Sequence, residues 1–509
     1  MRWTPGWRRA VVLAVAVAVA LAAVAGVEAQ RPQRELRMSY VSDVQNFDPA
    51  HFATDDYVAM NVFSGLVRYK THALAVEPDL AGRWEVSKDG KVYTFYLRQN
   101  AEWQKGYGKI TAQDIKFHFD RLKNPATRSR YRTVLDILER TDVVDDYTVR
   151  MTLKGPYSDF LPAILAWRPG WVVGKKIVDE LGTRLSLEPV ASGAYEVVSR
   201  RPRQEIVFRA HEKYFRGAPQ IKNARFIVIP NENTAALALQ KDEINLMIVR
   251  GVQAYLSLRA DPNIGMVVTP VAGWRGLVFN VTRKPLDDVR VRRALHHAID
   301  RKSLLQDVLH SFGTLDGTGS PIPPLVWGHI GDVPKFDYNP EQARRMIQEA
   351  GATGARLRLV FRPIGDDPAV VTVLQQMFRR AGIEVVLEQL EDAAYQRRRS
   401  SGDYDMLLEG PTRVAPDQFL TWMEGREYPG GANSSGYNGA DDLIARQRVE
   451  VDLGKRRLLL AEIQKKIAGD VPLVQLWRPF YVVASRKYVK NDVPNYRFWI
   501  TSWEHMKIE

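Results

Sequence analysis

The chain has 509 residues, contains no cysteine and carries a formal net charge of +13, from 72 lysine and arginine residues and 59 aspartate and glutamate residues. The lack of cysteine excludes disulfide bonds, thiolate metal sites, a cysteine nucleophile and a lipidated cysteine anchor. The positive charge is dispersed. Its longest cluster, residues 397–399, lacks the interleaved aromatic residues that stack on bases, so we expect no nucleic-acid partner. The length predicts roughly two or three domain-sized units.

The first residues have the pattern of a secretory signal peptide. Arg8 and Arg9 precede an almost unbroken Ala/Val/Leu run over residues 10–27, which leads into a V-x-A cleavage site at Ala29. We therefore predict a signal peptide over residues 1–29. An uncleaved anchor is the alternative, because the apolar run has borderline length for a membrane span. No other segment is as long and apolar, so we expect no stable membrane insertion after cleavage.

The next patterned segments are strands. Residues 35–41, ELRMSYV, are β-prone. In residues 81–98, AGRWEVSKDGKVYTFYLR, Asp89 and Gly90 separate two alternating runs, which predicts a hairpin with a type I′ turn. A helix is expected to follow, with Thr111 as its N-cap. Alternation places three side chains of the second hairpin strand on one face: Tyr93, Phe95 and Leu97.

Residues 276–301, GLVFNVTRKPLDDVRVRRALHHAIDR, join a short apolar strand to a sharply patterned helix. Pro285 ends the strand region, and Asp287 or Asp288 is placed to cap the helix that follows. The helix is amphipathic, and we expect its arginines to lie off the core-facing stripe. That stripe consists of Val291, Ala294, Leu295, Ala298 and Ile299.

Three further elements follow in the C-terminal half. Residues 338–351, YNPEQARRMIQEAG, have Pro340 near the first helical turn and glycine at the end, which is helix punctuation. Strands are expected from residues 382–385 and at residues 402–406. The segment 427–440, EYPGGANSSGYNGA, is turn-rich and predicts a loop before a helix.

These landmarks, taken in this order, resemble the family 5 extracellular solute-binding proteins of ABC importers. The resemblance rests on the 276–301 segment, the Asp-Gly hairpin, the PVASGAY turn at residues 189–195, the YDM strand and the SSGYNG stretch. It implies an α/β, two-lobed periplasmic-binding-protein-like fold of class II, the large peptide-binding type, with an extra subdomain in lobe I. The expected ranges are 30–272 for lobe I, about 76–184 for its subdomain, 273–481 for lobe II, and 482–509 for the return to lobe I, with hinges near residues 272 and 481.

The sequence contains no recognisable catalytic motif. A G-x-S-x-G elbow, an H-E-x-x-H helix, a P-loop and a dinucleotide glycine pattern are all missing. His296 and His297 point about 100° apart on a helix, so they do not converge as a metal pair, and we expect both at the surface or between the lobes. We predict no catalytic residue, no metal and no cofactor. A secreted hydrolase, and a periplasmic chaperone or scaffold, remain the alternatives.

The resemblance places a ligand between the lobes. Aromatic walls and a few polar anchors are typical of such a site. We select as aromatic candidates Trp274, Trp422, Tyr437 and Trp477, for each of which a place in the core is the alternative.

The resemblance also indicates which positions bind the ammonium and carboxylate groups of a peptide ligand. Peptide-binding relatives place an aspartate shortly before a "PD.F" motif to bind the ligand ammonium, whereas Thr412 or Arg413 stands there in this chain. A cation at this point repels an ammonium and attracts a carboxylate or phosphate. Asp417 of the motif is expected to cap a helix, and Arg362 lies near the arginine that holds a ligand carboxylate in dipeptide binders.

The predicted function is a periplasmic substrate-binding subunit that delivers a small solute to an ABC permease and, through it, to ATPase subunits. The resemblance implies a peptide as the commonest class of ligand. A modified peptide, an opine-like acid, a glycoside or a metal chelate, and in particular an anionic or amino-blocked solute, also fit.

Overall fold

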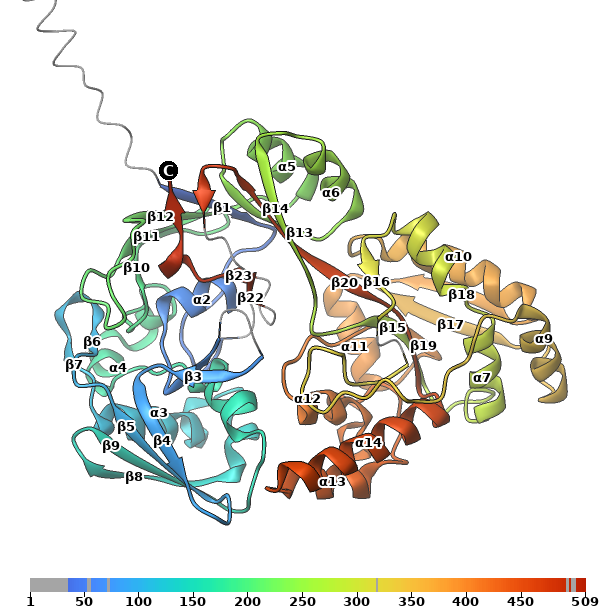
Figure 1. Cartoon of the computed structure of the whole chain (residues 1–509), viewed down its shortest axis with the longest axis horizontal. Helices are drawn as coiled ribbons and strands as arrows, with labels where there is room; N and C mark the ends of the chain where they lie inside the picture. The colour runs from blue at the N-terminus through green and yellow to red at the C-terminus, as the bar shows by residue number, and fades with distance from the viewer. Residues whose placement is uncertain (1–34, 53–55, 71–73, 317–318, 491–493, 496–499) are drawn as a thin grey trace, which may run out of the picture.

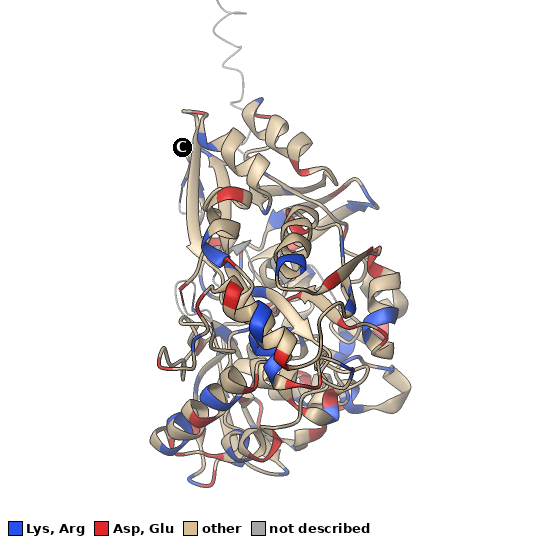
Figure 2. Ribbon diagram, turned by 90° about the vertical axis from the view of Figure 1, so that its right-hand side faces the viewer, with Lys and Arg blue, Asp and Glu red and all other residues tan. Residues whose placement is uncertain are grey.

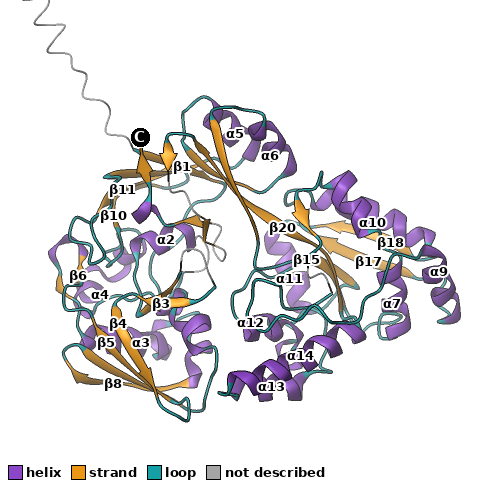
Figure 3. Ribbon diagram, viewed as in Figure 1, coloured by secondary structure: helices purple, strands orange, loops and turns teal. Residues whose placement is uncertain are grey.

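The computed structural model describes residues 35–52, 56–70, 74–316, 319–490, 494–495 and 500–509, so the predicted signal peptide lies outside the described residues. Figure 1 shows two lobes joined near β13, β14 and β20. The fold is α/β, and helices lie against the strands in both lobes (Figure 3). No helix in the described part of the chain is long and apolar enough to cross a membrane.

A twelve-stranded sheet runs through both lobes, in the order β10-β11-β12-β1-β13-β20-β15-β19-β17-β18, with β14 and β16 also paired to β20. Its lobe I strands are β1 (Leu36–Tyr40), β10 (Tyr195–Arg201), β11 (Glu205–Ala210), β12 (Asn223–Val228), β13 (Leu246–Val249) and β14 (Ile264–Pro270). Its lobe II strands are β15 (Arg275–Phe279), β16 (Gly313–Thr314), β17 (Arg356–Phe361), β18 (Glu384–Gln389) and β19 (Met406–Glu409).

The strand β20 (Leu473–Arg486) belongs to both lobes. Residues 480–486 pair with β14 of lobe I, and residues 473–477 pair with β15 of lobe II. Pro479 lies between the two pairings. It has no N–H to donate, and its carbonyl accepts from Val271 N–H at 3.1 Å. The sheet therefore changes partners at the proline, where the chain also crosses between the lobes through residues 270–275.

A separate four-stranded antiparallel sheet, in the order β4-β5-β9-β8, forms the extra subdomain of lobe I. The elements of this region are β2 (Val67–Tyr69), β3 (Val76–Pro78), β4 (Ala81–Val86), β5 (Val92–Leu97), β6 (Glu102–Trp103), β7 (Gly108–Lys109), α3 (Ala112–Lys123), β8 (Leu138–Asp145), β9 (Thr148–Leu153) and α4 (Lys175–Leu181). The predicted hairpin and its buried face of Tyr93, Phe95 and Leu97 are confirmed, as is Thr111 at the N-cap of α3.

The hairpin turn differs from the prediction. Its loop has five residues, 87–91, rather than two, and of Asp89 and Gly90 only the glycine has positive φ, at 70°. The type I′ prediction is therefore wrong. Gly90 N–H donates to the Ser87 carbonyl at 2.9 Å, while the Asp89 carboxylate accepts from the Ser87 hydroxyl and from Lys91 N–H, so these polar contacts replace the tighter turn.

Other lobe I elements are α2 (Asp56–Val62), α5 (Glu232–Gln240), α6 (Val252–Arg259), β21 (Val489–Lys490), β22 (Pro494–Asn495), β23 (Ile500–Thr501) and β24 (Lys507–Ile508). The end of the chain returns to this lobe, where β21 pairs with β24. Trp503 is fully buried there, with its ring edge-on to Tyr195 and Phe208 at centroid distances of 5.5 and 5.3 Å.

Lobe II contains helices on both faces of its sheet: α7 (Val289–His297), α8 (Arg301–Ser303), α9 (Pro340–Glu349), α10 (Asp367–Arg380), α11 (Asp392–Ser401), α12 (Pro416–Leu420), α13 (Asp441–Val449) and α14 (Leu453–Asp470). Alternate residues of β19 point to opposite faces. Met406 and Leu408 join the core beneath α7, α9 and α10, whereas Leu407 packs with Tyr395 of α11. The predicted strand and helix of residues 276–301 are confirmed, with Asp288 as the N-cap of α7.

Two residues of α7 are more buried than the sequence predicts. The guanidinium of Arg292 donates to the carbonyls of Asp470 and Val471, just where α14 ends, and its charge is favourable at that helix C-terminus. His296 is buried against Phe336, with 5.0 Å between ring centroids, rather than at the surface or between the lobes. The sequence predicts an exposed position for both side chains because they are polar, but the carbonyls at the end of α14 and the ring of Phe336 provide partners for them in the interior.

The burial of His296 predicts a pH dependence of stability. Burial, with Arg301 and then His297 adding to it, lowers the pKa of His296 to about 3. Because the unfolded imidazole takes up a proton below about 6.5 and the folded one does not, stability is lost as the pH falls from about 6.5 towards 3. This one group is expected to cost about 2 kcal/mol between pH 7 and pH 5.

The measurement is chemical denaturation of the parent and of His296→Gln at both pH values. The variant should lose less stability on acidification than the parent. A comparison with the parent is needed because burial raises the pKa of Asp79 to about 6. Protonation of this carboxyl group makes the folded state more stable as the pH falls, which opposes the effect of His296. His310→Asn, a change at an exposed position, is the control. Equal pH slopes for parent and His296→Gln would contradict the assignment.

Candidate functional site

The two lobes turn the carboxyl ends of their parallel strands towards each other. In lobe I, β1 pairs in parallel with β12 and β13, and in lobe II β17 pairs in parallel with β18 and β19. One contact links the loops at these ends: Val252 N–H, after β13, donates to the Asp366 carboxylate, after β17, at 3.3 Å. Beside the crossing between the lobes, Gly273 bridges to Thr412, after β19. Ligands of open α/β sheets bind outside the carboxyl ends of the strands.

Lobe I contributes Tyr40 and Arg250 to this region. Tyr40 is the last residue of β1, and Arg250 follows β13 directly. The Arg250 guanidinium lies 4.7 Å from the centroid of the Tyr40 ring and contacts its hydroxyl. Burial lowers the pKa of Arg250 and raises the pKa of the nearby Tyr481 well above its ordinary value. The result is a cation packed on an aromatic ring at the edge that faces lobe II.

Lobe II contributes Arg362, which follows β17. Its guanidinium donates to Asp392 at 2.8 Å and lies 4.8 Å from the ring centroid of Tyr395. The side chain of Asp392 is 71% exposed, so this carboxylate is readily rehydrated if another anion takes its place.

Arg275 and Asp367 form a buried pair beside Arg362. The Arg275 guanidinium donates to both carboxylate oxygens of Asp367, from Nε at 3.1 Å and from Nη2. Burial nevertheless raises the pKa of Asp367, because desolvation outweighs the attraction of Arg275. The pair is thus well aligned but costly to bury, as is usual for an ion pair held away from water.

Glu409, the last residue of β19, is a buried carboxylate. Its Oε2 accepts from Arg399 Nε at 3.1 Å and from the Tyr395 hydroxyl at 3.3 Å. No hydrogen bond reaches its Oε1 from the described part of the chain. Burial, and then the charge of Glu409, raise the pKa of Tyr395 well above its ordinary value. One carboxylate oxygen therefore has unused acceptor capacity in a setting where unpaired polar atoms are costly.

A pair of tryptophans adjoins this charged group. Trp274 and Trp422 lie edge to face at a centroid distance of 6.2 Å, and the Arg399 guanidinium is 5.4 Å from the Trp422 ring. The backbone at Gly410 passes close to that of Trp274, where a Cβ would come within 1.9 Å of the Trp274 carbonyl oxygen. Arg399 thus connects the tryptophans to Glu409.

The structure brings three of the predicted residues into one connected group. Trp274, Trp422 and Arg362 are linked through Arg399, Glu409 and Tyr395. Thr412 and Arg413 lie in the loop after Glu409, where Arg413 N–H donates to the Ala272 carbonyl at 3.0 Å.

Two predicted aromatics lie deeper in lobe II. The Tyr437 hydroxyl donates to the Asp470 carboxylate at 2.7 Å, within the same apolar cluster as Trp274 and Trp422. Trp477 lies on β20 opposite Arg275 and packs into the main core of the lobe.

Sequence reasoning missed Tyr40, Arg250, Arg399 and Glu409. Three of them end or directly follow a parallel strand, so the strand order would have drawn attention to them, but the pairing of distant strands is not visible in one sequence. Asp417 was expected to cap a helix, and this is wrong. It lies one residue inside α12, and its carboxylate binds Arg448 and Gln447 instead.

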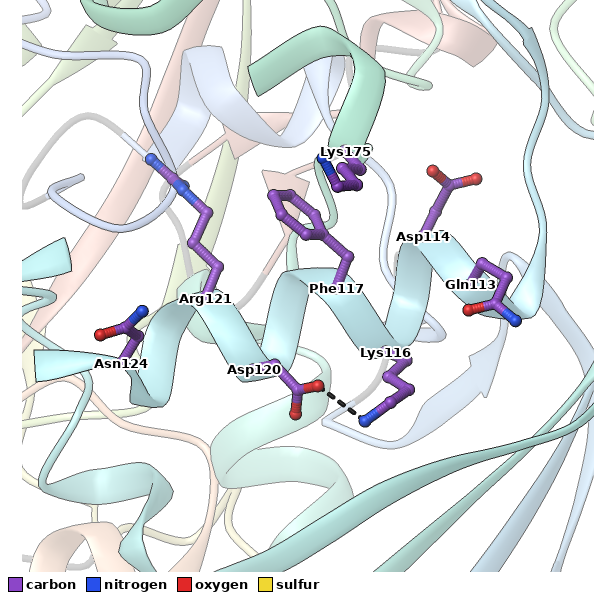
Figure 4. Close-up of a pocket in the computed structure, with 8 residues that line it drawn as sticks. All are labelled: Gln113, Asp114, Lys116, Phe117, Asp120, Arg121, Asn124 and Lys175. Carbon is purple, nitrogen blue, oxygen red and sulfur yellow. Dashed lines mark hydrogen bonds and ion pairs between the residues drawn. The ribbon is translucent and has the colours of Figure 1, made fainter. Parts of the chain in front are cut away.

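A surface hollow of about 440 Å³ lies on lobe I alone (Figure 4). It is open to solvent along α3, where Lys116 and Asp120 form an exposed pair and Lys175 lies above Phe117. None of the described residues of lobe II lines it. Figure 2 shows basic and acidic residues interspersed along the backbone of the elements in view. Among the described residues, no group of three or more His, Asp or Glu is arranged to hold a metal ion.

Fold and site together define a two-lobed solute-binding protein. The model of the bacterial extracellular solute-binding proteins, family 5 Middle, matches residues 75–427, and the chain belongs to this family. It is a family of binding proteins that serve ABC importers as substrate-binding subunits, and this is the functional class of the chain.

Individual relatives agree with this assignment. The chain is 28% identical to the dipeptide-binding protein of Escherichia coli K12, over 88% of this chain and 90% of that protein. It is similar to a periplasmic binding protein of Helicobacter pylori in complex with the peptide STSA, with a TM-score of 0.82 and 26% identity over 93% and 98% of the two chains. A binding protein of A. tumefaciens R10 in complex with mannopinic acid matches with a TM-score of 0.80 and 26% identity, over 93% and 99%.

Proposed function

We propose that this protein captures a peptide or a related small solute that bears a carboxylate, in the region between the two carboxyl edges. The observation that carries the proposal is the group formed by Arg362, Glu409 and the two tryptophans. A ligand carboxylate replaces Asp392 on Arg362, in a charge-assisted contact. The apolar part of the ligand packs beside the two tryptophans.

The relatives support this class of ligand without fixing one compound. Their names and complexes include a dipeptide, the peptide STSA and mannopinic acid. All three carry a carboxylate, which agrees with a basic anchor such as Arg362 and with Arg413 nearby.

The further parts of the proposal concern delivery. Residues 1–29 direct export and are removed, the mature protein is periplasmic, and it delivers its ligand to an ABC permease coupled to ATPase subunits. We propose lobe limits of 30–272 and 273–481, with residues 482–509 returning to lobe I and hinges near residues 272 and 481. The change of partners along β20 and the crossing at residues 270–275 support these limits.

The ligand class is tested by thermal unfolding of the mature protein with di- and tripeptides and opine-type acids. A true ligand raises the melting temperature in a saturable manner, because it binds the native state alone. Arg362→Gln should weaken binding of a carboxylate ligand about 10- to 100-fold, since a hydrogen bond to a charged group contributes about 1.5–3 kcal/mol.

Two controls make the test specific. Arg345→Gln, at an exposed position of α9, removes the same charge and should leave affinity unchanged. A C-terminally amidated peptide should bind parent and Arg362→Gln equally. If Arg362→Gln binds the free carboxylate as tightly as the parent, Arg362 is not the anchor, and if no compound shifts the melting temperature, the proposed ligand class is wrong.

A further inference from the structure

A short segment of the lobe I subdomain, residues 157–159, inserts into lobe II. Asp159 Oδ1 accepts from Arg456 Nη1 at 2.8 Å, and its Oδ2 accepts from the backbone N–H of Asp417 at 3.0 Å. Ser158 N–H donates to the Arg448 carbonyl at 3.1 Å. Figure 1 shows α12, α13 and α14 beside the subdomain, on the side of the molecule away from the crossing of β14 and β20. The segment therefore joins the lobes at the end opposite the crossing.

The pair of Asp159 and Arg456 is almost completely buried. The two side chains are 4% and 3% exposed. Arg456 is held in place from within lobe II, because its Nε and Nη2 donate to the Gln447 side chain at 3.2 and 3.1 Å. Removing one partner of such a pair leaves the other as an uncompensated buried charge.

The surface of lobe II that receives the segment is organised by its own contacts. Arg448 donates to the Asp417 carboxylate at 2.9 and 3.0 Å and to Glu424 at 3.0 and 2.7 Å. Gln447 also donates to Asp417, at 2.8 Å. From lobe I, the Tyr157 hydroxyl donates to this carboxylate at 3.1 Å. Lobe II thus provides a formed receptor for residues 157–159.

Arg456 has its carboxylate partner in the other lobe. Within lobe II, Asp417 and Glu424 bind Arg448, and the more exposed Arg426 lies 2.8 Å from Glu424 and 4.0 Å from Glu427. Arg456 donates instead to the neutral side chain of Gln447. Asp159 of lobe I supplies the negative charge that faces Arg456, and separation of the lobes removes it.

We propose that residues 157–159 and this lobe II receptor form an interlobe latch, closed by the Asp159–Arg456 pair, that favours the closed arrangement before any ligand binds. The latch biases closure rather than locking it, because desolvation of the two ions offsets much of their attraction. Its role in solute capture rests on the proposed function. A ligand that binds only the closed state then has an apparent affinity that depends on residues outside its own site.

The latch is tested by the distance between the lobes in the ligand-free protein. Because the sequence has no cysteine, Lys88→Cys in the β4–β5 loop and Glu462→Cys on α14, both at exposed positions, provide two unique spin-label sites. Pulsed electron spin resonance then gives the distribution of distances in the parent and in Arg456→Met and Asp159→Asn. The second variant keeps the shape of the side chain and changes a loop residue, so it remains informative if Arg456→Met folds poorly.

Each variant should raise the ratio of long to short distances at least about tenfold. Lys465→Met is the matched control. Lys465 lies on α14, as Arg456 does, and the change breaks its surface pair with Asp332, so the distribution of distances should stay unchanged. The proposal is overturned if folded Asp159→Asn keeps the parent distribution, or if the parent itself shows mainly the long distance. The measurement uses no ligand, so its failure is distinct from failure of the proposed solute class.

Discussion

Asp367→Ala should lower the free energy of unfolding by about 3 kcal/mol, because it leaves Arg275 as a buried charge without its bidentate partner. Loss of one member of a buried pair costs roughly 3–5 kcal/mol. We expect the lower end, because the Arg275 side chain keeps 14% exposure and can gain some hydration. Asp367 is also the first residue of α10, at the edge of lobe II that faces lobe I, so ligand binding should weaken together with stability.

The measurement is urea denaturation followed by circular dichroism. Asp332→Ala removes a carboxylate that is 93% exposed and paired with Lys465, and should cost less than about 1 kcal/mol. Since burial raises the pKa of Asp367, the intact pair is itself costly, and Arg275→Met with Asp367→Leu should recover most of the lost stability. A single-variant cost as small as that of Asp332→Ala would show that Arg275 is hydrated without its partner.

Trp503→Ala should cost about 3–5 kcal/mol, the range for removing a large aromatic side chain from a core. The residue is fully buried between Tyr195 and Phe208, and its backbone N–H donates to Asn61 at 2.9 Å. Because it anchors the C-terminal return to lobe I, its loss should also release residues 500–509 from the lobe surface.

Thermal and urea unfolding measure the stability, and limited proteolysis followed by mass spectrometry detects the released end. Tyr338→Ala removes an aromatic ring from an exposed position in lobe II and should change stability by less than about 0.5 kcal/mol. If Trp503→Ala were as stable and as resistant to proteolysis as the parent, the C-terminal return would not contribute to the lobe I core.

The elements that could be predicted from the sequence are those whose signals are local. The strand β15 and helix α7 follow from an apolar run, a proline and a capping aspartate, all within residues 276–301. The hairpin follows from alternation around Asp89 and Gly90, although contacts of Ser87 and Asp89 changed its turn. The burial of Arg292 was not predictable in the same way, because its partners lie at the end of α14, nearly 180 residues away.

The candidate site also combines residues that local motifs indicate with residues that only the tertiary structure brings together. Trp274, Trp422 and Arg362 were selected from motif resemblance, and the structure connects them through residues that no motif marks. Glu409 reads in the sequence as an ordinary strand residue of MLLE. It became a candidate only when β19 was placed beside β17, with Arg399 and Tyr395 of α11 covering its side chain. Tertiary pairing, rather than residue type, determines which carboxylate lies at the interlobe edge.

Pro479 restricts the path along which the two lobes can move. Its ring fixes φ near −65°, so one backbone rotation at the centre of β20 is unavailable where the strand passes between the lobes. The flanking residues are held in register by β15 on one side and by β14 on the other. Only a few torsion angles remain to accommodate opening, which gives the motion a preferred axis. A glycine at this position would add rotational freedom at the junction and leave the pairing of β20 with β14 and β15 intact. A wider range of lobe orientations would then compete with the one that closes the latch.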